Sequence, residues 1–212
     1  MSETVVRQAR PADVRAIYDL VQPYAENRIL IAKELIDYFE AVQEFVVAEL
    51  TDDAAPGARG SAVSATSSAG DRADSTPLSV GGPADSTPSA AGGPAGGRPI
   101  VGCGALHVLW DDIAEVRTLA VAPEMSGRGI GHRLLDALVG RARDLGLRRV
   151  FCLTFEVDFF RRHGFEVIAG TPVGTDVYAQ MLRSHDDGVA EFLDLARVKP
   201  NTLGNSRMLL EL

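Results

Sequence analysis

Two hydrophobic periods alternate along the chain and predict strands and helices in mixed order. Short apolar runs predict strands at 5–10, 45–50, 99–109, 114–121, 149–153, a stretch ending at 168, and 206–212. Apolar residues at helical spacing predict helices from 11, at 32–41, from the glycine-rich stretch near 130 to about 146, at 157–162 and at 175–183. This order predicts a single α/β domain with one central sheet. We expect the last strand to close an edge of that sheet.

Residues 51–98 differ from the rest of the chain in composition. They are almost entirely Ala, Gly, Ser, Pro, Thr and Asp, and the segment 73–83 is nearly repeated at 84–94. Such a segment has too few large apolar groups to offset the entropy of ordering it. We therefore expect a disordered low-complexity insertion within a domain that runs from residue 1 to 212. A tolerated spacer and a regulatory or docking segment both remain open.

Glycine at every second position follows the strand at 114–121 and opens a helix, at Gly127, Gly129 and Gly131. Without side chains, successive backbone amides can point into one concavity, and the helix N-terminus adds unpaired amides and partial positive charge. This arrangement predicts a seat for a phosphate or pyrophosphate. No Gly-Lys-Ser/Thr follows, which excludes a P-loop, and the spacing excludes the dinucleotide fingerprint. A glycine-rich turn without a ligand is the alternative.

Val121-Ala-Pro followed by Gly127-Arg-Gly-Ile-Gly resembles the acyl-CoA-binding motif of the GNAT superfamily of N-acetyltransferases. The resemblance implies a mixed, mostly antiparallel central sheet flanked by helices. It also implies acetyl-CoA as co-substrate and no metal. The cofactor contacts that it implies are Leu119, Ala120, Val121, Ser126, Gly127, Arg128, Gly129, Ile130, Gly131 and His132. Ser126 departs from the family, which usually has Gln or Arg there.

Further segments resemble N-acetylglutamate synthases, which acetylate glutamate at the head of arginine biosynthesis. They are Phe45-Val-Val-Ala-Glu49, Val101-Gly-Cys-Gly-Ala-Leu106, Phe159-Phe-x-x-His-Gly-Phe165 and Asn205-Ser-Arg-Met-Leu. The likeness is greatest to the short actinobacterial type, which lacks an amino-acid-kinase domain. It implies acetyl transfer to the α-amine of L-glutamate by direct attack in a ternary complex. Glutamine, another amino acid or a protein N-terminus as acceptor, and a non-catalytic acyl-CoA sensor, are alternatives.

Composition and net charge limit the classes of binding partner that the sequence favours. The chain is 46% hydrophobic and 24% charged, with a formal net charge of −8, which does not favour nucleic acid or an anionic membrane as partner. No apolar run reaches membrane-spanning length, and the N-terminus lacks a signal-peptide pattern. Cys103 and Cys152 lie in apolar surroundings, which favours reduced thiols in the cytoplasm. We expect a small amino acid as partner, and a closing edge strand would allow a homodimer.

Glu115 begins the strand that leads to the glycine loop, where many GNAT enzymes have a general base, often acting through water. A base is required because the attacking amine must lose its proton. Arg117 shares the face of Glu115, since side chains alternate along a strand. It suits either a substrate carboxylate or an ion pair with Glu115. Further candidates for binding a dicarboxylic acceptor, with solvated surface charge as the alternative, are Lys33, Lys199, Ser206 and Arg207.

The proton donor to the leaving thiolate is open. Many GNAT members have a tyrosine four residues before the Gly-Phe pair, but Phe160 stands there in this chain. The alternatives are Tyr178, Ser206, water or unassisted departure of the thiolate. Unassisted departure is reasonable because a thiol has a pKa of about 8.5.

The other titratable residues are interpreted as structural. His107 alternates with apolar strand residues, and His163 is expected to satisfy carbonyl groups at a helix C-terminus. Asp186 and Asp187 predict a turn rather than a catalytic dyad.

Overall fold

The computed structural model describes residues 3–27, 29–51, 98–198 and 204–212. The insertion predicted at 51–98 therefore lies outside the described residues except at its two ends. Thr51 is the last residue of a strand, and Arg98 precedes the next strand.

Seven strands form one sheet in the order β1-β2-β3-β4-β5-β7-β6. The strands are β1 (Glu3–Gln8), β2 (Phe45–Thr51), β3 (Ile100–Val108), β4 (Ile113–Val121), β5 (Arg149–Thr154), β6 (Glu166–Val167) and β7 (Ser206–Glu211). β4 and β5 run parallel, and the other neighbours in the sheet run antiparallel. The predicted α/β fold with a mixed, mostly antiparallel sheet is confirmed.

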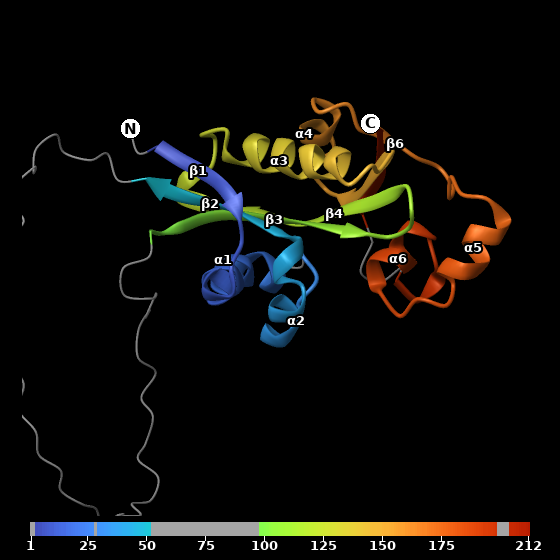
Figure 1. Ribbon diagram of the computed structural model, residues 1–212, viewed down its shortest axis with the longest axis horizontal. Coiled ribbons are helices and arrows are strands. Elements are labelled where there is room, and N and C mark those ends of the chain that lie inside the picture. The colour runs from blue at the N-terminus through green and yellow to red at the C-terminus, as the bar shows by residue number, and fades with distance from the viewer. Residues whose placement is uncertain (1–2, 28, 52–97, 199–203) are drawn as a thin grey trace, which may run out of the picture.

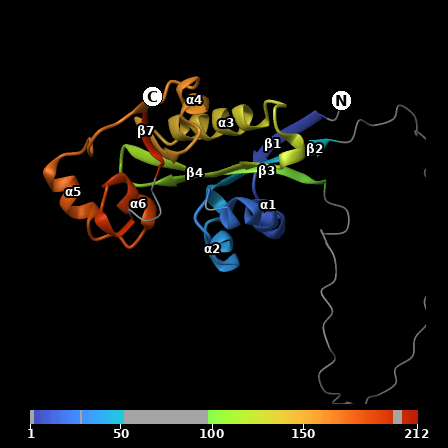
Figure 2. The same ribbon diagram turned by 180° about the vertical axis from the view of Figure 1, so that it is seen from behind.

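Helices cover both faces of this sheet (Figure 1). They are α1 (Val14–Glu26), α2 (Leu35–Glu40), α3 (Ile130–Asp144), α4 (Val157–Arg161), α5 (Thr175–Met181) and α6 (Asp187–Phe192). Short 3-10 turns lie at Pro11–Asp13, Val42–Glu44, Pro123–Met125 and Ala196–Val198. α3 and α4 lie on one face, and α1, α2 and α6 lie on the other, as the view from behind also shows (Figure 2).

α3 approaches the middle of the sheet closely because β3 carries two glycines beneath it. A Cβ at Gly102 would lie 2.9 Å from Leu134 Cδ1, and a Cβ at Gly104 would lie 2.9 Å from Leu138 Cδ1. Both leucines are fully buried. The close packing fixes the helix on the sheet, and with it the position of the helix N-terminus.

α1 is tied to the opposite face at its apolar stripe and near its end. Val14, Ile17 and Val21 recur at helical spacing and are buried against the sheet. Tyr24 donates a hydrogen bond to the backbone carbonyl of Val121, the last residue of β4. The helix is therefore connected to the strand that leads into the glycine loop.

The prediction that the last strand closes an edge of the sheet was wrong. β7 pairs with β5 over Ser206–Glu211, and Met208 and Leu209 pair with β6 on its other side. β1 and β6 form the edges, so the reason given for a homodimer through β7 no longer applies.

The prediction of a turn at Asp186 and Asp187 was also wrong. Asp186 is the N-cap of α6, and its carboxylate accepts a hydrogen bond from the amide of Val189 at 3.0 Å. The capping bond satisfies one of the free amides at the helix start. An acidic pair before an apolar stretch is thus the beginning of a short helix.

Candidate active site

β4 and β5 separate after three paired positions. Ile113–Glu115 pair with Arg149–Phe151, and among the described residues β4 has no strand partner on that side from Val116 onward. β5 instead continues along β7 as far as Thr154. The unpaired backbone groups of β4 are therefore available to an extended ligand that carries amides of its own.

A β-bulge interrupts β4 just after this separation. Thr118 has a φ of 56°, and two residues of β4, Thr118 and Leu119, stand against Gly104 of β3. The bulge changes the alternation: Arg117 lies on the face covered by α1 and α6, whereas Leu119 and Val121 pack into the core under α3. No glycine marks this position, so the sequence carried no signal for it.

The glycine loop has the geometry predicted for an anion seat. Gly127 and Gly129 both have a φ of 74°, and Gly129 is the N-cap of α3. A Cβ at either would meet nothing within 4 Å, so it is conformation and not crowding that requires glycine. The amide of Arg133 makes the first bond of the helix, to the carbonyl of Gly129 at 3.2 Å, which leaves the preceding amides without helix partners. The loop therefore fits a phosphate group.

The other residues of this predicted cofactor segment surround the loop. Ser126 and Arg128 are exposed, and Ile130 is buried under the first turn of α3. A Cβ at Gly131 would lie 3.5 Å from the ring of Phe159, which is an ordinary van der Waals distance.

His132 at the start of α3 faces a second histidine. His132 Nδ1 lies 2.7 Å from His163 Nε2, and the ring of Phe159 lies 4.9 Å from that of His132. His163 Nδ1 in turn lies 3.2 Å from the carboxylate of Asp136. The backbone amide of His163 donates to the carbonyl of Phe160 in α4 at 2.9 Å, as expected for a residue at a helix C-terminus, but both ring nitrogens contact side chains instead of carbonyls.

Glu115 is buried on the face covered by α1 and α6. Its exposed fraction is 3%, and its Oε2 atom has no hydrogen-bond partner among the described residues. Gly188 of α6 packs against that oxygen, since a Cβ at Gly188 would lie 2.0 Å from it. Burial raises the pKa of Glu115 to about 8, although the charge of Arg117 acts in the opposite direction. A carboxyl group of this kind can exchange a proton near neutral pH.

Arg117 is engaged mainly by two other carboxylates. Its guanidinium donates hydrogen bonds of 3.0 Å to Glu44 and to Asp186, and it lies 4.0 Å from Glu115 Oε2. Burial would raise the pKa of Glu44, but a 2.7 Å hydrogen bond with His107 and the charge of Arg117 lower it. Arg117 thus joins β4 to the start of α6 and to the turn before β2.

Glu191 of α6 is a site residue that sequence reasoning missed. It is 5% exposed, and its Oε1 atom has no hydrogen-bond partner among the described residues. Burial and the negative charges of Asp187 and Asp186 raise its pKa to about 7, while Lys33 and Arg117 lower it. The available signal was a single acidic residue inside the apolar run at 189–193. The charge of Lys33, a predicted substrate residue, therefore acts on the same cluster.

The remaining predicted substrate residues lie at the start of β7. Ser206 is paired with Thr154 of β5, and Arg207 donates a hydrogen bond to the carbonyl of Phe192 at the end of α6. Burial lowers the pKa of Arg207, and its Nε atom is buried without a partner among the described residues. Lys199 lies outside the described residues.

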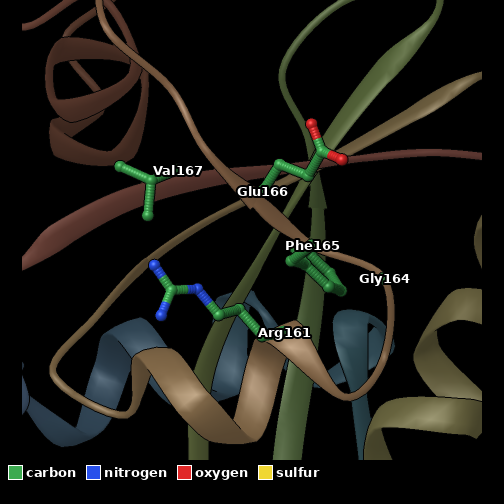
Figure 3. A pocket seen from close by; sticks show the side chains of 5 residues that line it. All are labelled: Arg161, Gly164, Phe165, Glu166 and Val167. Carbon is green, nitrogen blue, oxygen red and sulfur yellow. The ribbon is translucent and has the colours of Figure 1, made fainter.

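A separate hollow lies at the turn between α4 and β6 (Figure 3). It is lined by Arg161, Gly164, Phe165, Glu166 and Val167, none of which is a predicted site residue. Glu166 turns its carboxylate away from the guanidinium of Arg161 in this view.

Two kinds of site are absent from the part of the chain that the structure describes. No group of three or more His, Cys, Asp or Glu side chains there is arranged to hold a metal ion. No helix there is both long and apolar enough to cross a membrane.

A glycine loop at a helix N-terminus, reached from a strand whose neighbour has separated from it, suits a ligand that carries both phosphate groups and amides, as an acyl-CoA does. Residues 82–165 match the family described as Acetyltransferase (GNAT) family. The chain is 49% identical over 208 residues to the amino-acid acetyltransferase of Mycobacterium tuberculosis, which covers 98% of this chain and 94% of that protein. The chain therefore belongs to the GNAT acetyltransferase family, and the resemblance found in its sequence is confirmed.

Solved structures agree with this assignment. The crystal structure of Rv2747 from Mycobacterium tuberculosis in complex with CoA and NLQ has a TM-score of 0.73 and 49% identity, and covers 98% of this chain and 99% of that one. N-acetylglutamate synthase from Neisseria gonorrhoeae has a TM-score of 0.62 at 19% identity, with 100% of this chain matched to 36% of that one. This second likeness shows the shared fold.

Proposed function

We propose that the protein transfers the acetyl group of acetyl-CoA to the α-amine of L-glutamate, in the cytoplasm, at the first step of arginine biosynthesis. The observation that carries the proposal is Glu115, a buried carboxyl with a pKa of about 8, placed where β4 leaves β5. The 49% identity to an amino-acid acetyltransferase supports the acceptor class. The two free, buried cysteines, Cys103 and Cys152, support a reducing compartment.

The proposed CoA site combines the end of β4 with the glycine loop. On the β5 side, Leu119–Val121 has no strand partner among the described residues and would hydrogen-bond the extended pantetheine arm, except through the Val121 carbonyl, which accepts from Tyr24. The amides of the loop would hold the pyrophosphate. Bound there, acetyl-CoA supplies a thioester carbonyl that is activated toward attack. The residues assigned to this site are Leu119, Ala120, Val121, Ser126, Gly127, Arg128, Gly129, Ile130, Gly131 and His132.

Glu115 is the proposed general base. It takes a proton from the ammonium group of the acceptor, directly or through one water, so that an N–H bond breaks and an O–H bond forms. The freed nitrogen lone pair attacks the thioester carbonyl and forms the C–N bond. The C–S bond then breaks and CoA leaves as the thiolate, while the nitrogen gives its second proton to that thiolate or to water and becomes the neutral amide. Neither buried cysteine has a histidine partner in the structure, which supports direct attack rather than an acyl-enzyme.

The acceptor is proposed to lie between the segment before α2 and the start of β7. Lys33, whose charge acts on Glu191, is the proposed contact before α2, and Arg207 keeps a buried Nε donor without a partner among the described residues. Lys199 is assigned from its place in the sequence alone. Ser206, the preceding residue of β7, is the fourth proposed contact.

Glutamine is the second candidate acceptor, for one specific reason. Arg117 is already hydrogen-bonded to Glu44 and Asp186, which leaves less positive charge for a second substrate carboxylate. The side-chain amide of glutamine, in place of the second carboxylate, would need one hydrogen-bond donor and one acceptor from the protein instead of a full cation.

The test is release of CoA thiol from acetyl-CoA with glutamate, glutamine, aspartate or leucine as acceptor. We expect turnover on glutamate and a loss of about 10²–10⁴-fold in Glu115→Gln, with acetyl-CoA binding retained. Asp176→Asn, which changes an exposed carboxylate of α5, is the matched control and should leave the rate unchanged. Acetyl-CoA binding without turnover on any amino acid would contradict the proposal and favour a sensor.

A further inference from the structure

α6 places a second buried carboxyl group beside Glu115. Gly188 packs against Glu115 Oε2, and Glu191 lies three residues further along the helix, which puts both residues on one side of it. α6 is held in place by Phe192, whose ring meets that of Phe151 edge to face at 5.3 Å. Two carboxyl groups on packed elements thus share one water-excluded region.

Each of the two groups has a buried oxygen without a hydrogen-bond partner among the described residues, Oε2 of Glu115 and Oε1 of Glu191. Their exposed fractions are 3% and 5%. A buried carboxylate without partners costs much more than a protonated carboxyl in the same place. Burial therefore favours the protonated form of both groups. A general base such as Glu115 needs this tendency to accept a proton from the amine.

Charged groups surround the two carboxyls from every element packed against them. Those that act on Glu115 or Glu191 are His107, Arg117, Lys33, Asp186 and Asp187. Arg117, which lies 4.0 Å from Glu115 Oε2, donates its hydrogen bonds to Glu44 and Asp186. The negative charge of Glu191 also raises the pKa of Glu115, as burial does. The pair therefore disfavours two simultaneous negative charges.

We propose that Glu191 is a positioning residue for the catalytic base: its carboxyl group, buried beside Glu115 on α6, makes Glu115 a stronger proton acceptor for the amine. The inference rests on the proposed function and names a residue for the same site. The proton leaves the acceptor nitrogen and forms an O–H bond on Glu115, and no further reactant is needed. Glu191 touches neither substrate in this scheme.

The experiment is the pH profile of kcat/KM for glutamate in the wild type and in Glu191→Gln. Without the second charge, Glu115 stays ionised to lower pH, so the acid limb should move down by about one pH unit. Because a weaker base accepts the proton less readily, the plateau should fall about threefold. Glu191→Asp keeps the charge and should restore most of the wild-type profile. Asp176→Asn, on exposed α5, should leave the limb in place.

An acid limb that does not move in active, folded Glu191→Gln overturns the inference, even if stability changes, because a packing role alone predicts that result. If the glutamine variant does not fold, Glu191→Leu removes the same charge with an apolar side chain of similar volume, a replacement that buried ionised groups commonly tolerate. The same shift is then expected, and an unmoved limb overturns the inference. The failure of the proposed function has a different sign: wild-type protein that acetylates no amino acid. An unmoved acid limb in an active variant overturns only the role of Glu191.

Discussion

The backbone of Gly188 lies directly against the carboxylate of Glu115, so that a Cβ at Gly188 would stand 2.0 Å from Glu115 Oε2 and 3.0 Å from Asp186 Oδ1. No side chain fits between α6 and the proposed base. The position of the six-residue helix α6 therefore determines the environment of the Glu115 carboxyl group.

Gly188→Ala should damage both stability and activity, because the added methyl group must displace α6 or Glu115. We expect a loss of about 1–3 kcal/mol in the free energy of unfolding, as for overpacked cores, together with slower release of CoA thiol. Urea unfolding and the thiol assay measure the two effects. Gly140→Ala in the interior of α3 is the control, since a Cβ there meets nothing within 4 Å. It should stabilise by about 0.5–1 kcal/mol. Equal effects of the two substitutions would count against the contact.

Gly129→Ala should weaken acetyl-CoA binding more than its stability cost suggests. Gly129 has a φ of 74° at the N-cap of α3, and Gly146, after the end of the same helix, has a φ of 77°. Neither Cβ would meet another atom within 4 Å. Each alanine should therefore cost about 1 kcal/mol through backbone strain. Only Gly129→Ala should raise the KM for acetyl-CoA, measured from initial rates. A similar rise in Gly146→Ala would show that strain in α3, and not the loop, sets this KM.

Stability should fall as pH rises from about 4.5 to about 8, because the folded protein binds more protons than the unfolded chain in that range. The pKa of Glu115 is raised from 4.5 to about 8 and that of Glu191 from 4.5 to about 7, in both cases mainly by burial. Each contribution is fully present below the unfolded pKa and is lost as pH rises through the folded one. One pKa unit corresponds to about 1.4 kcal/mol. Urea unfolding at pH 5.5 and 8.5 measures the change.

Glu191→Gln should flatten this pH dependence, since the amide does not ionise. The variant should gain stability relative to the wild type at pH 8.5 and little at pH 5.5. The opposite pKa shifts of Glu44 and Asp186 act on the acid side of this range, because both groups have lowered pKa values. Parallel curves for the two proteins would show that Glu191 is not buried as described.

Phe160→Tyr should not supply the proton donor found in many family members. Phe160 is 5% exposed and its ring packs edge to face on Phe165 at 5.1 Å. A hydroxyl added there would be buried without a partner, which costs about 1–3 kcal/mol. We expect a lower melting temperature and no gain in kcat. A higher kcat would instead mean that this position reaches the leaving thiolate and that its phenylalanine limits the rate.

Local patterns predicted much of the molecule. The strand before Pro123, the glycine loop and α3 were all expected, because apolar periodicity and glycine spacing are properties of neighbouring residues. Gly146 ends that helix with a positive φ, as a glycine after a helix usually does. Glu115 and Arg117 were correctly placed on one face of a strand, since alternation requires only that the strand be regular over three residues.

Other features depended on distant parts of the chain. The φ of 56° at Thr118 is imposed by pairing with β3 and carries no sequence signal. α6 is only six residues long, and its capping acids resemble a turn; it is stabilised by packing against the sheet rather than by its own helical propensity.

The sequence by itself determined the family, the order of most elements and the glycine loop at the start of α3, because these depend on short spacings along the chain. The tertiary structure alone decided that β7 lies inside the sheet, that Arg117 bonds Glu44 and Asp186, and that Glu191 stands beside Glu115. The reason is physical: a carboxyl group becomes a base near neutral pH only when residues far away in the chain remove water from it. Glu115 and Glu191 both have raised pKa values because α6 packs against β4 in the folded protein.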